Sequence, residues 1–241
     1  MNILKLPTNP VAVYMQGSLN ATKLAIALPG KLDTKDYPHM RSHVDFLASK
    51  GYLALSFDPP GTWESPGSIE LYTMNNYLLA IRELITHFDN RPTIVLGHSR
   101  GGGMATLAGI QNKSVTHFIS IMGGAYPSDA WLKVDSKPSQ RDMPMTNPVM
   151  YKEFTMPHAF MDAREVEDLS NDFENCTKPK LFILGTKDEL IAPEEVQSFY
   201  EKFVNPKELY ELDCGHDYRR YPDKIEEVNN VIGTFLTTYS I

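Results

Sequence analysis

The chain has 241 residues, 42% of them hydrophobic, which is enough for one well-packed domain with a sizeable insertion. It carries 23 lysine and arginine residues against 30 acidic ones, and its net charge of -7 argues against a nucleic-acid partner. Residues 1–17 are interrupted by Pro7 and Pro10 and contain no signal-peptide core or membrane span, so we expect a cytoplasmic protein without stable membrane insertion. The two cysteines, Cys176 and Cys214, lack metal-ligand spacing with histidine and are expected to be free thiols.

Apolar, β-branched runs recur at regular intervals along the chain. They predict strands over residues 11–15, 24–28, 52–57, 93–96, 118–122, 181–184 and 208–212. Segments of helical period lie between most of them, most clearly around residues 74–85 and 225–239. This alternation predicts an α/β fold with a mostly parallel central sheet, helices on both faces and the N-terminal strand pair as an antiparallel edge. A binding site is then expected at the carboxyl ends of the strands.

One interval, residues 125–178, is far longer than a single crossover connection requires. We interpret it as a lid inserted into a core formed by residues 1–124 and 179–241. It is rich in methionine and aromatic residues, which suit an adaptable apolar surface over a pocket. These residues are Met143, Met145, Met150, Met156, Met161, Tyr126, Trp131, Tyr151, Phe154 and Phe160. The same side chains could instead fasten the insertion onto the domain, and the sequence leaves both interpretations open.

The run Gly97-His98-Ser99-Arg100-Gly101 matches the pattern Gly-x-Ser-x-Gly between a predicted strand and a predicted helix. A sharp strand-to-helix turn holds its serine in a strained backbone conformation, and flanking glycines let the strand and helix approach closely. The pattern therefore indicates a nucleophilic serine. Ser99 as a simple helix cap is the alternative. No Gly-Lys-Ser or Gly-Lys-Thr follows at phosphate-loop spacing, and the glycine pattern fails the dinucleotide fingerprint.

With this motif the chain resembles the α/β-hydrolase superfamily, in particular its serine esterases and serine aminopeptidases, from about residue 11 to the C-terminus. The resemblance implies a triad in the chain order serine, acid, histidine. Gly185-Thr-Lys-Asp188 after a predicted strand identifies Asp188 as the acid, with Glu189 as a fallback. Gly215-His216 before the last helix identifies His216 as the base, and every other histidine precedes Asp188. His98 is expected to pack, and Asp58, a weaker candidate for the acid, is expected to lie in a loop that shapes the site.

Two backbone amides should stabilise the oxyanion of the reaction. The resemblance assigns them to Arg100, directly after the serine, and to Lys31, in the segment Leu28-Pro29-Gly30-Lys31 that replaces the frequent His-Gly pair of the family. Gly30 and Trp63, from the loops after the second and third predicted strands, are expected to contact substrate.

We therefore expect a serine hydrolase that cleaves a carboxylic ester or thioester of a small to medium, partly apolar acyl substrate through an acyl-enzyme. A serine aminopeptidase or amidase is a second possibility, with Glu64, Glu165, Glu167 and Asp168 as candidates for binding an amino terminus. A ligand-binding protein that has kept the fold and lost turnover is a third. No cofactor or metal is implied, because the chain has no cysteine cluster. The oligomeric state is left open.

Overall fold

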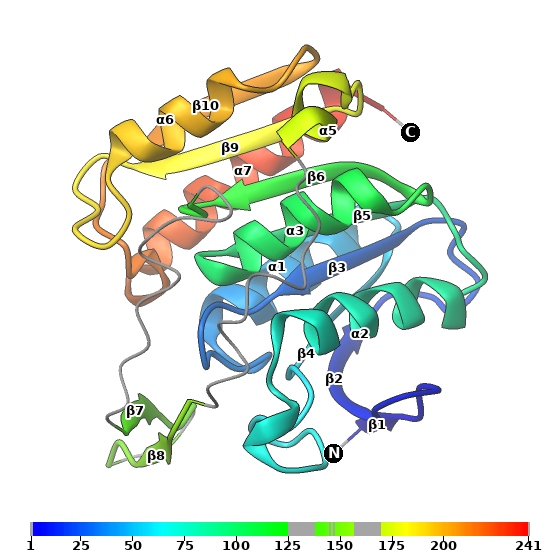
Figure 1. Ribbon diagram of the computed structural model, residues 1–241, viewed down its shortest axis with the longest axis vertical. Helices are drawn as coiled ribbons and strands as arrows, with labels where there is room; N and C mark the ends of the chain where they lie inside the picture. Colours follow the sequence, from blue (N-terminus) through cyan, green and yellow to red (C-terminus); the bar gives the residue numbers. More distant parts are fainter. Residues whose placement is uncertain (1, 125–137, 145, 147, 157–169, 241) are drawn as a thin grey trace.

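One sheet of eight strands organises the protein (Figure 1). The structure is a computed structural model that describes residues 2–124, 138–144, 146, 148–156 and 170–240. In spatial order the strands are β1 (Asn2–Leu4), β2 (Val11–Gln16), β4 (Leu53–Phe57), β3 (Leu24–Leu28), β5 (Thr93–His98), β6 (Val115–Ile121), β9 (Lys180–Gly185) and β10 (Lys207–Leu212). The six strands from β4 to β10 run parallel, whereas β1 and β2 pair in antiparallel fashion at one edge.

Helices cover both faces of this sheet (Figure 1). One face carries α2 (Met74–His87), α3 (Arg100–Gln111), the short α5 (Ser170–Asn175) and α6 (Pro193–Glu201). The other face carries α1 (Pro38–Ser49) and α7 (Pro222–Thr238), and two 3₁₀ turns, η1 (Ile69–Leu71) and η4 (Tyr218–Arg220), lie in connections. Each face has its own apolar core. The predicted sheet with helices on both sides is therefore confirmed.

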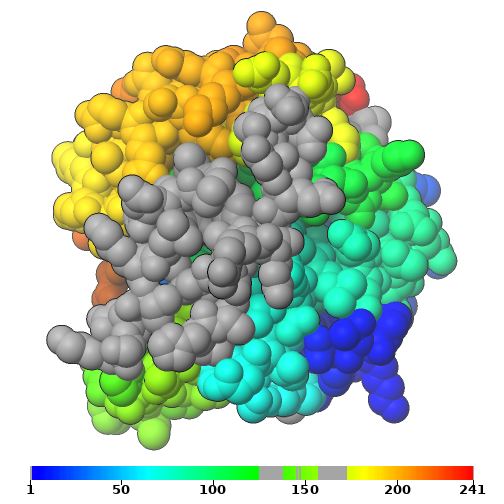
Figure 2. Space-filling model, viewed as in Figure 1, coloured from blue at the N-terminus to red at the C-terminus, as the bar shows by residue number. Residues whose placement is uncertain are grey.

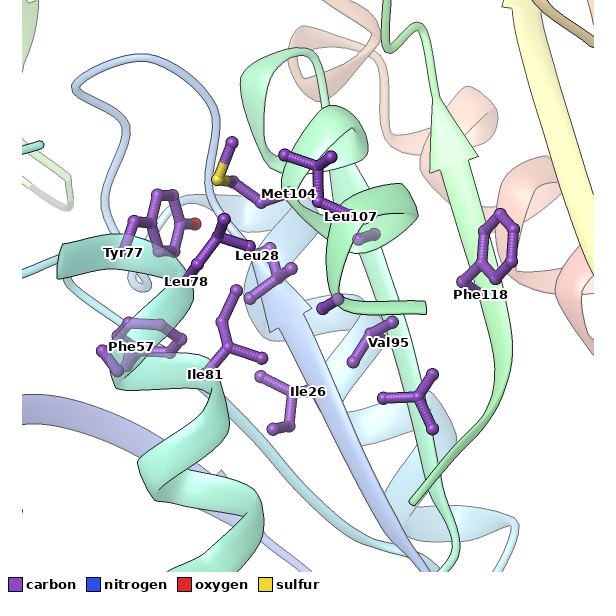
Figure 3. Close-up of a cluster of buried hydrophobic side chains, with 14 of the residues drawn as sticks. Ile26, Leu28, Phe57, Tyr77, Leu78, Ile81, Val95, Met104, Leu107 and Phe118 are labelled. Atoms are coloured by element: carbon purple, nitrogen blue, oxygen red, sulfur yellow. The ribbon is translucent and has the colours of Figure 1, made fainter. Parts of the chain in front are cut away.

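Side-chain alternation along the buried strands explains the two cores. On β3, Ile26 and Leu28 point toward α2 and α3, where they meet Tyr77, Leu78 and Met104 in a continuous cluster (Figure 3). The intervening Ala25 and Ala27 belong to the core on the opposite face. All five residues of β3 are buried, as expected for a central parallel strand.

The seven predicted strands and the helices over 74–85 and 225–239 are present, with ends shifted by a few residues. The prediction that the first two predicted strands pair at an antiparallel edge was wrong for the second of them, β3. β4 lies between β2 and β3, and β3 runs parallel to both its neighbours in the middle of the sheet. The antiparallel edge consists of β2 and the additional strand β1, whose three residues are too few and too exposed to give a periodic signal.

Within the insertion, β7 (Ser139–Asp142) and β8 (Tyr151–Phe154) form a separate antiparallel hairpin. In Figure 2 its light-green atoms lie beside the cyan atoms of the segment that follows β4. Phe154 and Met156 are buried in the main core, and the Phe154 ring lies 5.3 Å from that of Trp63. These two side chains fasten the insertion to the domain. Met145, Met161, Tyr126, Trp131 and Phe160 lie outside the described residues, so the lid remains a prediction.

Two further expectations concern the whole chain. Cys176 and Cys214 are both free and buried, as predicted. Among the helices of the described ranges, none is long and apolar enough to cross a membrane.

Candidate active site

Ser99 occupies the turn between β5 and α3 in an unusual backbone conformation, with φ 54° and ψ -120°. Such a conformation costs a non-glycine residue about 1–3 kcal/mol and persists when its surroundings hold it. Here the Ser99 N–H donates to the carbonyl of Ile121 on β6 at 2.8 Å, and the Ser99 carbonyl accepts the Gly102 N–H at 2.9 Å. The turn thus lifts the Ser99 side chain above the carboxyl end of β5, as the motif predicts.

The glycines of the motif have steric reasons. A Cβ atom on Gly101 would lie 2.0 Å from the Leu28 carbonyl oxygen, and one on Gly97 would lie 2.2 Å from the Gly101 carbonyl oxygen. Any side chain at either position would therefore push α3 away from β3 and β5. Close packing at this corner is what allows the first turn of α3 to begin directly at Arg100.

Asp188 lies in the turn after β9 and is buried. Its Oδ1 accepts the backbone N–H groups of Leu190 and Ile191, both at 2.9 Å, and its Oδ2 faces His216. Burial alone would raise the pKa of Asp188, but the bonds from His216 and from the two amides outweigh it and leave the pKa below its ordinary value. The carboxylate is thus ionised at neutral pH and fixed in orientation.

His216 completes a hydrogen-bonded series of three side chains. Its Nδ1 lies 2.8 Å from Asp188 Oδ2 and its Nε2 lies 2.9 Å from Ser99 Oγ. With Nδ1–H donating to the carboxylate, the Nε2 lone pair is free to accept the serine hydroxyl. The sheet explains this meeting, because β9 and β10 are parallel neighbours and the Lys187 N–H donates to the Cys214 carbonyl just beyond their ends.

His98 does more than pack. It is buried at the end of β5, and its Nε2 donates to the backbone carbonyl of His216 at 2.9 Å. Its ring also lies against that of His216, with centroids 4.9 Å apart. The residue before Ser99 therefore holds the loop that carries His216.

A cavity of about 320 Å³ opens beside Ser99. Its lining residues are Lys31, Asp33, His98, Ser99, Arg100, Arg141, Leu190, Ile191, His216 and Asp217. Both expected oxyanion residues are thus at the cavity. Arg100 begins α3, so its N–H lies at the positive end of the helix dipole. Gly30 packs against Ser99, since a Cβ there would lie 3.4 Å from Ser99 Cβ.

Other expected residues lie elsewhere. Trp63 donates its indole N–H to the Leu32 carbonyl and packs on Phe154, outside the cavity lining, so its contact with substrate remains a prediction. The exposed Glu64 pairs with Lys35 at 2.7 Å. Glu165, Glu167 and Asp168 lie outside the described residues. Glu189 lies beside Gly215, while His216 bonds to Asp188.

Asp58, the weaker candidate for the acid, connects two loops. Its carboxylate is fully buried and accepts hydrogen bonds from Thr34 Oγ1, from the Lys35 N–H and from the Glu64 N–H. The Lys35 ammonium lies 3.4 Å away. Asp58 therefore joins the loop after β3 to the loop after β4, in keeping with the expected shaping role.

Sequence reasoning missed a buried charged group behind the triad. Asp33, in the loop after β3, accepts a hydrogen bond from Arg219 of η4 at 3.2 Å. Arg141 of β7 lies 3.9 Å from the same carboxylate oxygen. Asp33 and Arg219 are 186 residues apart in the chain, so no local motif could have indicated their pairing.

One set of described residues could approach a metal ion: ligand atoms of Asp33, His39 and His98 lie within 4.8 Å of one another. The charges around Asp33 do not fit a dication, because Arg219 already bonds to its carboxylate and Arg141 lies 3.9 Å from it. We therefore derive no metal chemistry from this set.

Known proteins share this architecture. The family described as alpha/beta hydrolase fold matches residues 26–142. Est1E from Butyrivibrio proteoclasticus, solved with ferulic acid, is 17% identical with a TM-score of 0.78, covering 99% of this chain and 98% of its own. The Pyrococcus furiosus esterase Pf2001 is 23% identical with a TM-score of 0.72, covering 98% and 91%. The enol-lactonase of Burkholderia xenovorans LB400 is 15% identical with a TM-score of 0.73, covering 98% and 100%.

No curated protein matches the chain by sequence. The family match covers β4, β5, β6, most of β3, the loop after β3 and the turn that contains Ser99, and the structural similarity extends over nearly the whole chain. Residues 26–142 are similar to the alpha/beta hydrolase fold family, and the chain as a whole has the α/β-hydrolase fold.

Proposed function

We propose that this protein is a serine hydrolase that cleaves a carboxylic ester or thioester, with Ser99 as nucleophile, His216 as general base and Asp188 as the acid that orients it. The observation that carries the proposal is the hydrogen-bonded series Ser99 Oγ, His216 Nε2, His216 Nδ1 and Asp188 Oδ2, with distances of 2.9 and 2.8 Å, at the wall of a cavity. A serine hydroxyl is a weak nucleophile until such a base accepts its proton.

In the first half of the reaction, Ser99 Oγ attacks the carbonyl carbon and His216 Nε2 takes the hydroxyl proton. The carbonyl π electrons move to the oxygen, which the Arg100 and Lys31 amides would stabilise. Asp188 offsets the positive charge of the imidazolium. When the tetrahedral intermediate collapses, His216 returns its proton to the leaving alcohol or thiol and the acyl group remains on Ser99.

In the second half of the reaction, water takes the place of Ser99 as the attacking group and Ser99 becomes the leaving group. His216 accepts a proton from the water, the hydroxyl attacks the acyl-enzyme carbonyl, and Ser99 leaves with the proton that His216 donates. The products are a carboxylic acid and free Ser99. The proton transfers between Ser99 and His216 use two atoms, Oγ and Nε2, that lie 2.9 Å apart.

An ester or thioester is the preferred substrate class for two reasons. Leu190 and Ile191 give the Ser99 cavity an apolar wall suited to an acyl group. One of the similar structures is described as an esterase and another, from the curacin biosynthetic pathway, as a thioesterase domain. A substrate with a free amino terminus would need an unpaired carboxylate at this cavity. Among the described lining residues, both carboxylates are paired with arginine: Asp33 with Arg219, and Asp217 with Arg219 and Arg220.

The test combines labelling with turnover. Purified protein is treated with a fluorophosphonate probe and assayed on p-nitrophenyl esters of increasing chain length, on acyl thioesters and on aminoacyl amides. We expect a label at Ser99 and turnover of esters or thioesters. Ser99→Ala should remove the label and lower kcat by a factor on the order of 10⁶ without loss of fold.

Each alternative has its own outcome. Hydrolysis of aminoacyl amides in preference to esters would favour an aminopeptidase or amidase with the same triad. Folded protein that takes no label and hydrolyses none of the substrates would favour a non-catalytic ligand-binding protein. Ser120→Ala, which removes a buried hydroxyl from β6, is a matched control and should keep the label.

A further inference from the structure

Three loops must hold their positions if Ser99, His216 and the oxyanion amides are to act together. They are the loop after β3 (residues 29–37), the turn that contains Ser99, and the loop from His216 into η4. Strand pairing ends at Leu28, His98 and Leu212, and just beyond it the Ser99 N–H bonds to Ile121 of β6, so the three loops lie largely outside the sheet. Other contacts must therefore fix them.

Asp33 lies where these loops meet. It is two residues after Lys31, and its side chain is only 6% exposed. Its Oδ1 accepts a hydrogen bond from Arg219, three residues after His216. Its Oδ2 lies 3.9 Å from Nδ1 of His98, the residue before Ser99. A single carboxylate thus faces groups from all three loops.

The insertion reaches the same carboxylate. Arg141 of β7 lies 3.9 Å from Asp33 Oδ1 and donates through Nη2 to the Lys31 carbonyl at 2.7 Å. Its neighbour Asp142 accepts the Tyr37 hydroxyl through its backbone carbonyl at 2.9 Å. The hairpin therefore contacts the loop after β3 on both sides of Asp33.

The carboxylate also balances charge near the base. Arg219 lies over the Tyr37 ring and pairs with Asp33 and with the half-exposed Asp217. Burial opposes ionisation of Asp33, but the Arg219 and Arg141 guanidinium groups hold its pKa well below the ordinary value. Burial keeps the pKa of His98 below its ordinary value, so that ring stays neutral. The His98 ring lies between Asp33 and His216, with its centroid 4.9 Å from that of the His216 ring. Asp33 is then the buried negative charge that offsets the two guanidinium groups near His216.

We propose that Asp33 is a positioning residue for the reaction at Ser99. It holds the His216 loop and the loop carrying Lys31 in register, and it cancels positive charge that would otherwise oppose the imidazolium formed at His216. The inference rests on the proposed function, since it requires Ser99 and His216 to be the reacting groups.

The main test is Asp33→Asn, which keeps the size of the side chain and removes its charge. We expect kcat to fall about 10- to 100-fold, as for misplacement of reacting groups by about an ångström, with KM changed far less. The uncompensated charge of Arg219 and Arg141 should also shift the acid limb of the kcat/KM profile to lower pH, by about one unit. The titratable groups around Arg219 and Arg141 are Asp33, Asp217, His39, Tyr37 and Tyr72, and those in contact with His216 are Asp188 and His98.

A second substitution separates charge from shape. Arg219→Gln alone should move the acid limb to higher pH, because Asp33 then loses its closest cation. The double variant Asp33→Asn with Arg219→Gln removes one charge of each sign. The acid limb of its kcat/KM profile should therefore return toward the wild-type pH, although kcat stays low. A purely structural role for the pair would lower both parameters without this opposed movement. If Asp33→Asn does not fold, Arg219→Gln carries the test from the other side of the pair.

The matched control is Asp213→Asn, which removes an exposed carboxylate three residues before His216. Water screens that charge, so kcat and the acid limb should stay within about twofold and 0.2 units of wild type. Wild-type kcat and an unmoved acid limb in folded Asp33→Asn would overturn the inference. Failure of the wild-type protein to label at Ser99 would instead overturn the proposed function.

A bound metal is the competing explanation for the position of Asp33, His39 and His98. His39 has no hydrogen-bond partner at either ring nitrogen among the described residues, and neither does His98 at Nδ1. Elemental analysis of the purified protein, before and after dialysis with zinc, decides between the two. A stoichiometric metal that is lost in His39→Ala would overturn the positioning role, and metal-free active protein supports it.

Discussion

Acid should destabilise this protein through His43, which lies on α1 behind the loop that carries His216. The ring is fully buried, with Nδ1 at 2.6 Å from Asn229 Oδ1 and Nε2 at 2.7 Å from the Tyr218 hydroxyl. Asn229 uses its own amide nitrogen to donate to Ser42, so its oxygen accepts from His43 Nδ1–H. Nε2 must then accept from Tyr218, and a second proton on the ring would force the Tyr218 hydroxyl to turn from donor to acceptor and would leave a charge in the core.

The size of the effect follows from the pKa difference between folded and unfolded chains. Burial lowers the pKa of His43 from 6.5 to about 4. Above pH 6.5 neither state is protonated and stability is unaffected. As the pH falls below 6.5, His43 becomes protonated in the unfolded chain but stays neutral in the folded chain. The free energy of unfolding therefore decreases until about pH 4, where the folded chain also binds the proton. At pH 5 the loss from this residue is about 2 kcal/mol, taking about 1.4 kcal/mol for each pKa unit.

Urea unfolding followed by circular dichroism at pH 7.5, 6.5, 5.5 and 5.0 measures this loss. His43→Asn keeps a donor toward Asn229 and leaves the Tyr218 hydroxyl without its acceptor, so it should cost about 1–3 kcal/mol at pH 7.5. Between pH 7.5 and 5, the free energy of unfolding of His43→Asn should fall by about 2 kcal/mol less than that of the wild-type protein. His87→Asn, at an exposed position, is the control and should keep the wild-type slope. An equal slope in His43→Asn would refute the reasoning.

Three further substitutions test the active site. Asp188→Asn should lower kcat about 10⁴-fold with little change in fold, because the amide no longer holds the imidazole in the required tautomer, and steady-state kinetics on the best ester substrate measures it. Gly101→Ala would bring a Cβ to 2.0 Å from the Leu28 carbonyl oxygen, so we expect a loss of several kcal/mol in urea unfolding, and wild-type stability would contradict the packing argument. Ser99→Gly should be inactive but about 1 kcal/mol more stable than Ser99→Ala, because glycine tolerates a φ of 54°.

The parts of the fold that the sequence predicts are those with a short-range signal. Buried parallel strands such as β3 and β9 are continuous apolar runs, and the amphipathic period of α2 and α7 is clear. β1 has three exposed or half-buried residues and gives no such signal. The order of β2, β4 and β3 depends on how the chain crosses the sheet, which the local pattern does not encode.

The candidate site divides in the same way. Ser99, Asp188 and His216 could be found because each follows a strand in a short motif with glycine. Asp33 and Arg219 are ordinary charged residues in their local sequence, and their pairing depends on two loops that meet across 186 residues. The contact of Trp63 with Phe154 likewise depends on where the insertion folds back.

The contacts that hold the site differ in kind from those that hold the sheet, and this has a consequence for substitutions. The core consists of apolar side chains whose truncation typically costs 2–5 kcal/mol of stability. Beyond the strand ends, the loops are joined by buried polar bonds such as Asp58 to Thr34 and His98 to the His216 carbonyl. Such bonds are directional, and their net contribution to stability is small because desolvation offsets them. Conservative changes at these bonds should therefore reduce turnover more than they reduce the free energy of unfolding, whereas changes in the core should do the opposite.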